Sequence, residues 1–262
     1  MRVPSFEKQG AGRETIILLH GIGAGAGMFT PQLSGLSDTF TVIAWNMPGY
    51  GDTPLDGPMS FEGLAETLLS LIDHLGIGKA NLVGHSIGGM VAQEFYARHP
   101  ERVATLVLSA TTSAFGSRDG EFQRKFIADR LAPLDAGKTI PELAAGFVPK
   151  LVGSASEPTA VAIAQEAMSR LSPDTYREVI RCLATFDRRE DLKRICVPTL
   201  VIAGEEDTNG PAATLKKMAE SIEGARFACL PGIGHLAPLE APDAYNALLR
   251  GFYSDTIGGD TA

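Results

Sequence analysis

The sequence predicts an α/β protein with a doubly wound, mostly parallel sheet and an inserted helical cap. Three observations lead to this fold class. Short apolar runs alternate with amphipathic stretches along most of the chain. One long segment, from about residue 112 to about residue 194, interrupts this alternation with helical stretches alone. The 262 residues are 44% hydrophobic, which is enough to bury a large core.

Six apolar runs are the predicted strands. Each run is short and continuous, which is typical of parallel strands that are buried on both faces. The runs cover residues 15–21, 40–49, 81–86, 103–110, 198–207 and 226–232. Because little sequence precedes the first run, we expect the first strand or two of a complete sheet to be missing or reduced to RVPSFEK at residues 2–8.

Four amphipathic stretches between these runs predict helices. The first begins after Ser60, a good N-cap residue, and its apolar side chains recur on one face. The second follows the strand at 81–86 and stops before Pro100. We expect the final residues, TIGGDTA, to be frayed. The four predicted helices cover residues 60–77, 88–99, 213–222 and 242–253.

The segment from about Thr112 to about Arg194 contains helical stretches separated by Pro and Gly and no convincing strand. It is too long for a simple connection between two strands. We therefore predict a helical cap inserted after the strand at 103–110. The expected division is a first core part at residues 1–111, the cap at 112–194 and a second core part at 195–262.

Composition and charge argue against several classes of protein. The formal net charge is −8 and the 23 Lys and Arg residues form no basic run, which disfavours a nucleic-acid partner. The N-terminus lacks the apolar stretch of a signal peptide, and no run approaches the roughly 20 apolar residues of a membrane span. Three widely spaced cysteines, Cys182, Cys196 and Cys229, are expected to be buried thiols of a reducing compartment. A cytoplasmic protein without a bound metal is the expectation.

The motif G-x-S-x-G occurs once, at residues 84–88 in NLVGHSIGGM. A Gly-Ser turn is the simple interpretation, but here a predicted strand precedes the motif and a predicted helix follows it. In that context the glycines permit a sharp turn that presents Ser86 as a nucleophile at the strand tip. The backbone N–H of Ile87 then points to the position where an oxyanion would form.

A serine hydroxyl needs a general base to become a nucleophile. His235 follows a predicted strand in LPGIGHLAP, so it lies on a loop at the same carboxyl edge of the sheet as Ser86. The other histidines have simpler interpretations. His99 is a solvated residue at a helix end, and His85 is adjacent to the serine but is turned away from its hydroxyl. We expect His85 to pack against or line the pocket.

A third group must orient the imidazole and stabilise its cation. The run VIAGEED ends a predicted strand with three acidic residues, Glu205, Glu206 and Asp207. Asp207 is favoured because it lies farthest past the strand end. We expect the two glutamates to be solvated or to form ion pairs.

A second oxyanion donor is expected in LHGIGAGAG, residues 19–27, because a glycine-rich loop brings a backbone N–H close to the serine. Ile22 is the assigned donor and Gly23 the alternative. Such loops also bind phosphate, but the surrounding pattern of a nucleotide site is absent.

The HGIG loop, the NMPGYGDT turn, the GHSIGG motif, the GEED turn and the GIGHLAPLEAP loop together resemble the α/β-hydrolase superfamily. The resemblance covers nearly the whole chain and is greatest to small cap-bearing esterases and 3-oxoadipate enol-lactonase-like hydrolases. It implies Ser86 as nucleophile, Asp207 as acid and His235 as base. It also implies oxyanion donors at Ile22 and Ile87, and neither a metal nor an organic cofactor.

The resemblance also narrows the chemistry. Carbon–carbon hydrolases of the meta-cleavage type usually have asparagine before the serine, where this chain has His85. Haloalkane dehalogenases and epoxide hydrolases of this fold use an aspartate nucleophile, where this chain has Ser86. The expected function is therefore hydrolysis of a small to medium ester or lactone. Carbon–carbon hydrolysis, a ligand receptor and a cofactor-free oxygenase are the alternatives.

The first glycine-rich loop and the cap are expected to shape an apolar pocket for a small-molecule substrate. One of two cap arginines, Arg124 or Arg130, could bind a substrate carboxylate, although both are equally consistent with solvated helix charges. The sequence does not decide between a monomer and a homodimer. The expected pocket residues are Gly21, Gly23, Met28, Phe29 and His85.

Overall fold

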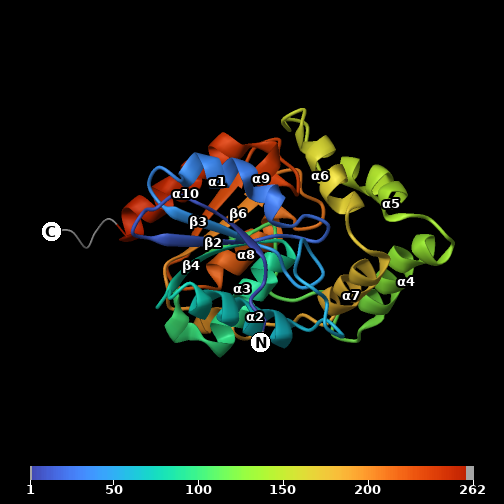
Figure 1. The fold of residues 1–262 in the computed structure, drawn as a ribbon, viewed down its shortest axis with the longest axis horizontal. Helices are drawn as coiled ribbons and strands as arrows, with labels where there is room; N and C mark the ends of the chain where they lie inside the picture. The colour runs from blue at the N-terminus through green and yellow to red at the C-terminus, as the bar shows by residue number, and fades with distance from the viewer. Residues whose placement is uncertain (1, 258–262) are drawn as a thin grey trace.

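A seven-stranded sheet forms the centre of the computed structural model, which describes residues 2–257 (Figure 1). The strand order is β1-β3-β2-β4-β5-β6-β7, and all neighbours are parallel except β1 and β3. All six predicted strands are confirmed. The strands are β1 (Phe6–Gln9), β2 (Thr15–Leu19), β3 (Thr41–Trp45), β4 (Ala80–His85), β5 (Val103–Ser109), β6 (Thr199–Gly204) and β7 (Arg226–Leu230).

The N-terminal segment supplies one strand of the sheet. β1 pairs antiparallel with β3, with Phe6 opposite Trp45 and Gln9 opposite Val42. It includes Phe6, Glu7 and Lys8 of the RVPSFEK segment, so the sheet begins with one short antiparallel strand. The short segment therefore still covers the outer edge of β3.

Helices cover both faces of the sheet, because successive residues of each strand point to opposite faces. On β2, Ile16 and Leu18 pack into one buried cluster, whereas Ile17 and Leu19 pack into the other. In Figure 1, α1 and α10 lie above the sheet, and α2 and α3 lie below it. These core helices are α1 (Thr30–Leu36), α2 (Phe61–His74), α3 (Ile87–Arg98), α8 (Ala212–Glu220), α9 (Ala237–Glu240) and α10 (Pro242–Ile257).

The four predicted core helices are confirmed as α2, α3, α8 and α10. The Ser60 hydroxyl accepts a hydrogen bond from the Gly63 N–H at 3.1 Å, as an N-cap should. The sequence pattern did not indicate α1, a seven-residue helix with a proline in its first turn. Thr256 and Ile257 belong to α10, and the rest of the tail that was expected to fray lies outside the described residues.

Four helices are inserted between β5 and β6. They lie together beyond one end of the sheet, at the right of Figure 1. This arrangement confirms the predicted helical insertion. An isolated bridge between Ala114 and Asp187 brings the two ends of the insertion together. The inserted helices are α4 (Glu121–Asp135), α5 (Ile140–Phe147), α6 (Ala160–Ser169) and α7 (Pro173–Leu183).

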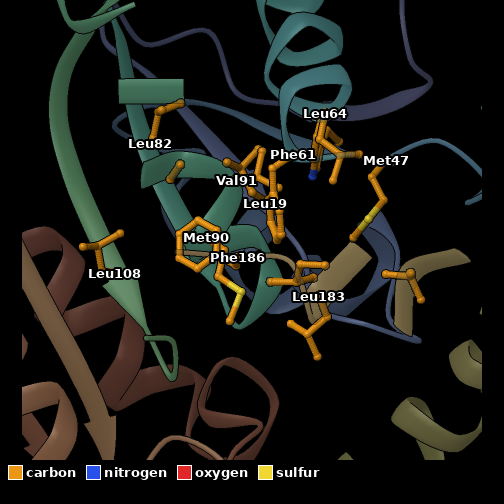
Figure 2. Close-up of a cluster of buried hydrophobic side chains, with 14 of the residues drawn as sticks. Leu19, Met47, Phe61, Leu64, Leu82, Met90, Val91, Leu108, Leu183 and Phe186 are labelled. Carbon is orange, nitrogen blue, oxygen red and sulfur yellow. The ribbon is translucent and has the colours of Figure 1, made fainter. Parts of the chain in front are cut away.

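The end of the insertion packs into the same buried cluster as the sheet. Figure 2 shows Leu183 and Phe186 beside Met90 of α3 and Phe61 of α2. The rings of Phe61 and Phe186 are 4.7 Å apart between centroids. The hydrophobic contact of Leu183 and Phe186 with the core therefore holds the end of the insertion against α2 and α3.

The expectation of three buried thiols is wrong for two of the cysteines. Cys182 on α7 is buried, but Cys196 and Cys229 are exposed. Cys229 lies on β7, the edge strand, where one face is open to solvent. Cys196 lies between the insertion and β6. Within residues 2–257, no helix is both long enough and apolar enough to span a bilayer.

Candidate active site

The turn between β4 and α3 presents Ser86 in an unusual backbone conformation. Its φ is 55° and its ψ is −121°. A residue with a Cβ atom seldom adopts this conformation, which costs about 1–3 kcal/mol. Two hydrogen bonds hold it: the Ser86 N–H donates to the Ser109 carbonyl at 2.9 Å, and the Thr111 hydroxyl donates to the Ser86 carbonyl at 2.7 Å.

The glycines around Ser86 allow α3 to approach the sheet closely. A Cβ atom on Gly84 would lie 2.5 Å from the Gly88 carbonyl oxygen. A Cβ atom on Gly88 would lie 2.1 Å from the Leu19 carbonyl oxygen on β2. Because these neighbours are backbone atoms, any side chain at either position would push the helix away. The motif therefore has the strand, turn and helix context that the sequence predicted.

Side chains from three loops meet at the carboxyl edge of the sheet. Ser86 follows β4, Asp207 follows β6 and His235 follows β7. The His235 Nε2 atom lies 3.2 Å from the Ser86 Oγ atom. The His235 Nδ1 atom lies 2.8 Å from Asp207 Oδ2. The three residues that the sequence singled out are thus in hydrogen-bond contact.

Asp207 is buried and ionised. Burial raises the pKa of its carboxyl, but hydrogen bonds from His235 and from the N–H groups of Gly210 and Asn209 outweigh burial and hold the pKa below its usual value. The Asn209 and Gly210 N–H groups donate to Oδ1 at 2.8 and 3.0 Å. Oδ2 is left to accept the hydrogen bond from His235.

The two neighbouring glutamates hold loops instead of the imidazole. Glu205 accepts a hydrogen bond from the Gly232 N–H at 2.9 Å. Glu206 accepts two from Ser154, at 2.7 Å from its N–H and at 2.6 Å from its hydroxyl. Each glutamate carboxylate accepts hydrogen bonds from a loop, in addition to its exposure to solvent.

The loop that carries His235 is held by a buried glutamate on α9. Glu240 Oε2 accepts hydrogen bonds from the Gly153 N–H at 2.7 Å and the Gly234 N–H at 2.9 Å. Glu240 Oε1 accepts one from the Leu236 N–H at 2.7 Å. The His235 N–H donates to the Leu151 carbonyl at 2.6 Å. The histidine loop is therefore tied to the insertion from both sides.

The glycine-rich loop after β2 is held by the turn after β3. His20 is fully buried, and its Nδ1 donates to the Gly21 carbonyl at 2.8 Å while its Nε2 accepts from the Met47 N–H at 3.2 Å. Burial lowers the pKa of His20 to about 4, against a smaller opposite effect of the Gly21 hydrogen bond. His20 is therefore a neutral ring at pH 7. Asn46 Oδ1 accepts from the Ala26 N–H at 2.8 Å and fixes the far end of the loop.

The candidate oxyanion donors differ in what their N–H groups bind. The Gly23 N–H donates to the Tyr50 hydroxyl at 3.2 Å, so it is already engaged. Within the described residues, the N–H groups of Ile22 and Ile87 donate to no protein acceptor. A Cβ atom on Gly21 would lie 3.2 Å from the Ser86 Cβ atom, so the loop passes directly over the serine. This arrangement favours Ile22 over Gly23.

A cavity of about 340 Å³ opens over Ser86 and His235. Its walls are mostly apolar and come from the core and from the insertion alike. A smaller cavity of about 30 Å³ adjoins it and shares Met28 and Met168 with it. The insertion contributes Phe115, Phe122, Phe126, Arg130, Phe147, Leu151, Met168, Tyr176, Ile180 and Leu183 to the larger cavity.

The expected pocket residues divide three ways. Gly21, Met28 and His85 line the larger cavity, and Gly23 lines only the smaller one. The expectation for Phe29 is wrong. Phe29 is fully buried in the cluster on the other face of the sheet, because consecutive residues of this short 3₁₀ turn point in different directions.

His85 lines the cavity as a neutral imidazole. Burial is the main reason that its pKa lies well below the usual value, and the charge of His235 lowers it further. Its ring centroid lies 5.3 Å from that of His235, and its Nδ1 atom is buried without a hydrogen-bond partner among the described residues. His85 thus adds a polar group to the pocket wall beside the candidate base.

The two cap arginines differ sharply in position. Arg124 is exposed, and its guanidinium contacts the Asp119 carbonyl at 3.4 Å. Arg130, on the same helix, lines the cavity. The described residues contain no cluster of three or more His, Cys, Asp or Glu side chains able to hold a metal ion.

Comparison with known proteins now gives the family. Residues 14–242 match the family described as alpha/beta hydrolase fold. The chain belongs to the α/β-hydrolase family. The strand order, the antiparallel first strand and the helical insertion are all consistent with this membership, and the resemblance seen in the sequence is confirmed.

The chain is similar to hydrolases with several different substrates. A protein of Azorhizobium caulinodans proposed to be the carbamate hydrolase RutD is 32% identical, over 94% of this chain and 93% of its own length. A thermophilic esterase of Thermogutta terrifontis is 27% identical with a TM-score of 0.86, over 96% and 93% of the two chains. The enol-lactonase of Burkholderia xenovorans LB400 is 26% identical with a TM-score of 0.86, over 95% and 96%.

Sequence reasoning did not single out the residues that support this α/β-hydrolase site. Glu240 and Tyr50 both lie in motifs of the family pattern, in GHLAPLEAP and NMPGYGDT. Their roles depend on long-range contacts with the insertion and with the glycine-rich loop. A glutamate between apolar residues and prolines was the available signal, because an ionisable residue in such surroundings is commonly hydrogen-bonded.

Proposed function

We propose that this chain is a serine hydrolase that cleaves a small to medium carboxylic ester or lactone through an acyl-enzyme. The observation that carries the proposal is the hydrogen-bonded series from Ser86 through His235 to the buried carboxylate of Asp207. The esterase and enol-lactonase among its structural neighbours support the same substrate class.

The first half of the reaction forms the acyl-enzyme. His235 Nε2 takes the proton of the Ser86 hydroxyl as Oγ attacks the carbonyl carbon. Asp207 stabilises the imidazolium cation that results. The N–H groups of Ile22 and Ile87 donate to the oxyanion, and one such donor is worth about 3 kcal/mol in the transition state. The imidazolium then protonates the leaving alkoxide; the alcohol of an ester departs, whereas that of a lactone stays attached to the acyl group.

The second half releases the acid. His235 takes a proton from water, and the resulting hydroxide attacks the acyl carbonyl in the same oxyanion site. Collapse of this intermediate returns the proton to Ser86 Oγ and frees the carboxylic acid. Each half therefore uses the same base, the same donors and the same carbonyl position.

The test combines covalent labelling with turnover. The protein is incubated with a small fluorophosphonate and its intact mass is measured, and p-nitrophenyl acetate and butyrate hydrolysis are followed in parallel. One adduct and measurable turnover are expected, and both are absent in Ser86→Ala. A folded protein with neither an adduct nor turnover contradicts the proposal and favours a receptor.

Two further outcomes would indicate a different reaction at the same site. Activity on an aromatic heterocycle that persists in Ser86→Ala would favour cofactor-free oxygenation, in which the histidine acts as base without acylation of the serine. Loss of colour from a dienoate would favour carbon–carbon hydrolysis. The neutral His85 beside the serine, in place of the asparagine usual in carbon–carbon hydrolases of the meta-cleavage type, is the observation against that reaction.

A further inference from the structure

Arg130 is the one permanently charged side chain among the described residues that line the 340 Å³ cavity. The other polar side chains of the cavity wall are hydroxyls, one amide and two histidines, of which His85 is neutral. No aspartate or glutamate lines the cavity in the described part of the chain. The cavity therefore carries an uncompensated positive charge on the side of the insertion.

Aromatic rings from two helices hold the guanidinium in position. Its Cζ atom lies 4.0 Å from the ring centroid of Phe147 on α5 and 5.3 Å from that of Phe126 on α4. The Tyr176 side chain on α7 also interacts electrostatically with the guanidinium. Three helices of the insertion thus contribute to one cation site. A guanidinium has five N–H donors and an aromatic ring face accepts no conventional hydrogen bond, so N–H donors remain for a ligand.

Apart from the exposed Arg118 and Arg124, the other arginines of the insertion each form an ion pair with a carboxylate of the chain. Arg170 pairs with Glu166, Arg177 with Asp135, Arg181 with Glu178 and Arg188 with Glu94. Arg130 lines a cavity instead, and it has no carboxylate within 4.0 Å in the described residues. Burial lowers the pKa of its guanidinium, yet an arginine remains charged in a folded protein.

A half-buried cation without a counter-ion is unfavourable unless a ligand supplies the negative charge. A carboxylate fits best, because a guanidinium edge donates two parallel hydrogen bonds to the two oxygens of a carboxylate. The apolar walls between Arg130 and Ser86 suit a short hydrocarbon linker. A substrate would then span the cavity, with its reacting carbonyl at Ser86 and its free carboxylate at Arg130.

We propose that Arg130 binds a free carboxylate on the substrate, so that the preferred substrates are short esters that carry a second, unesterified carboxyl group. This inference rests on the proposed ester hydrolysis at Ser86. Hydrolysis of such a monoester with one water gives a dicarboxylate and an alcohol.

The test compares charged and neutral esters of matched size. The substrates are the monomethyl and dimethyl esters of succinate, glutarate and adipate, and kcat/KM is measured for each by titration of the released acid. The wild type is expected to prefer at least one monoester to its diester at least tenfold. Arg130→Gln is expected to lower that preference at least tenfold, mainly through the KM of the monoester. Arg130→Lys retains the positive charge and is expected to keep part of the preference for the monoester.

Arg124→Gln is the matched control, because Arg124 lies on the same helix but is exposed and outside the cavity. It is expected to leave the preference unchanged. The inference is overturned if the wild type prefers the diesters, or if Arg130→Gln lowers the monoester and diester rates by the same factor. The second result would mean that Arg130 only holds α4, α5 and α7 together.

Binding to a Ser86→Ala variant separates this inference from the proposed function. Calorimetric titration with the same six esters requires no turnover. Tighter binding of a monoester that disappears in the Ser86→Ala, Arg130→Gln double variant supports the carboxylate site even if no ester is hydrolysed. Turnover of p-nitrophenyl esters without any monoester preference would leave the proposed function intact and overturn the inference.

Discussion

The imidazole of His235 lies 3.2 Å from the hydroxyl of Ser86, although 149 positions separate the two residues in the chain. The contact exists because β4 and β7 are parallel strands of one sheet, so their carboxyl ends open at the same edge. Ser86 directly follows β4 and His235 lies only a few residues beyond β7, so both side chains lie close to this edge. The geometry of the site is thus a direct consequence of the sheet topology.

Asp207→Asn is expected to lower kcat by about 10³–10⁴-fold with little loss of fold, because an amide holds the ring without stabilising the imidazolium. The measurement is kcat on p-nitrophenyl butyrate together with the urea midpoint. Glu205→Gln is the control, since its exposed carboxylate contacts Gly232 instead of the imidazole. Equal losses in the two variants would refute a specific role for Asp207.

Ser86→Gly is expected to be inactive but more stable than Ser86→Ala by about 1 kcal/mol, because glycine adopts a positive φ without strain. The φ of 55° at this position is the basis of the prediction. The free energies of unfolding of both variants and the wild type are measured in urea. A Ser86→Gly variant no more stable than Ser86→Ala would show that the turn stores no backbone strain.

The sequence predicted the parallel strands and the site loops because their signals are local. A continuous apolar run predicts a buried strand, and a glycine-flanked serine after such a run predicts the turn. The environment of Arg130 could not be predicted in this way. Phe126 lies four residues before Arg130 on α4, but Phe147 and Tyr176 come from α5 and α7, whose packing against α4 has no signature in the spacing of residues. The same holds for Phe29, whose direction depends on a 3₁₀ turn.

Stability is expected to fall as the pH drops from about 6.5 to about 4, partly through His20. Its pKa of about 4 in the folded state lies below the ordinary value of 6.5. In that window the unfolded chain binds a proton at this position and the folded chain does not, so unfolding is favoured as the pH falls. The difference amounts to about 3 kcal/mol at pH 4.

His20→Gln removes the titrating group, so its free energy of unfolding should change less between pH 7 and pH 4.5 than that of the wild type. Urea titrations at several pH values give the two slopes. His85 remains in the variant and still contributes, because burial lowers its pKa as well. Parallel slopes for the variant and the wild type would mean that the pKa of His20 is the same in the folded and the unfolded chain.

Glu240 is expected to control the position of His235 without contact with the substrate. Its buried carboxylate accepts hydrogen bonds from Gly153 of the insertion and from Gly234 and Leu236 on either side of the histidine. Glu240→Ala leaves three backbone N–H groups without this acceptor, at about 1–3 kcal/mol each where they stay buried. Glu240→Gln keeps one accepting oxygen and is expected to cost less stability.

The activity of these variants shows whether Glu240 sets the position of the His235 imidazole or only stabilises the fold. At a temperature where Glu240→Gln is fully folded, its kcat is expected to fall at least about tenfold with KM nearly unchanged, because a displaced base slows proton transfer. Glu206→Gln is the matched control, since Glu206 also joins the insertion to a core loop, through Ser154, but is exposed. If Glu240→Gln lowers the urea midpoint while its kcat equals that of the wild type, Glu240 stabilises the loop without setting the position of the imidazole.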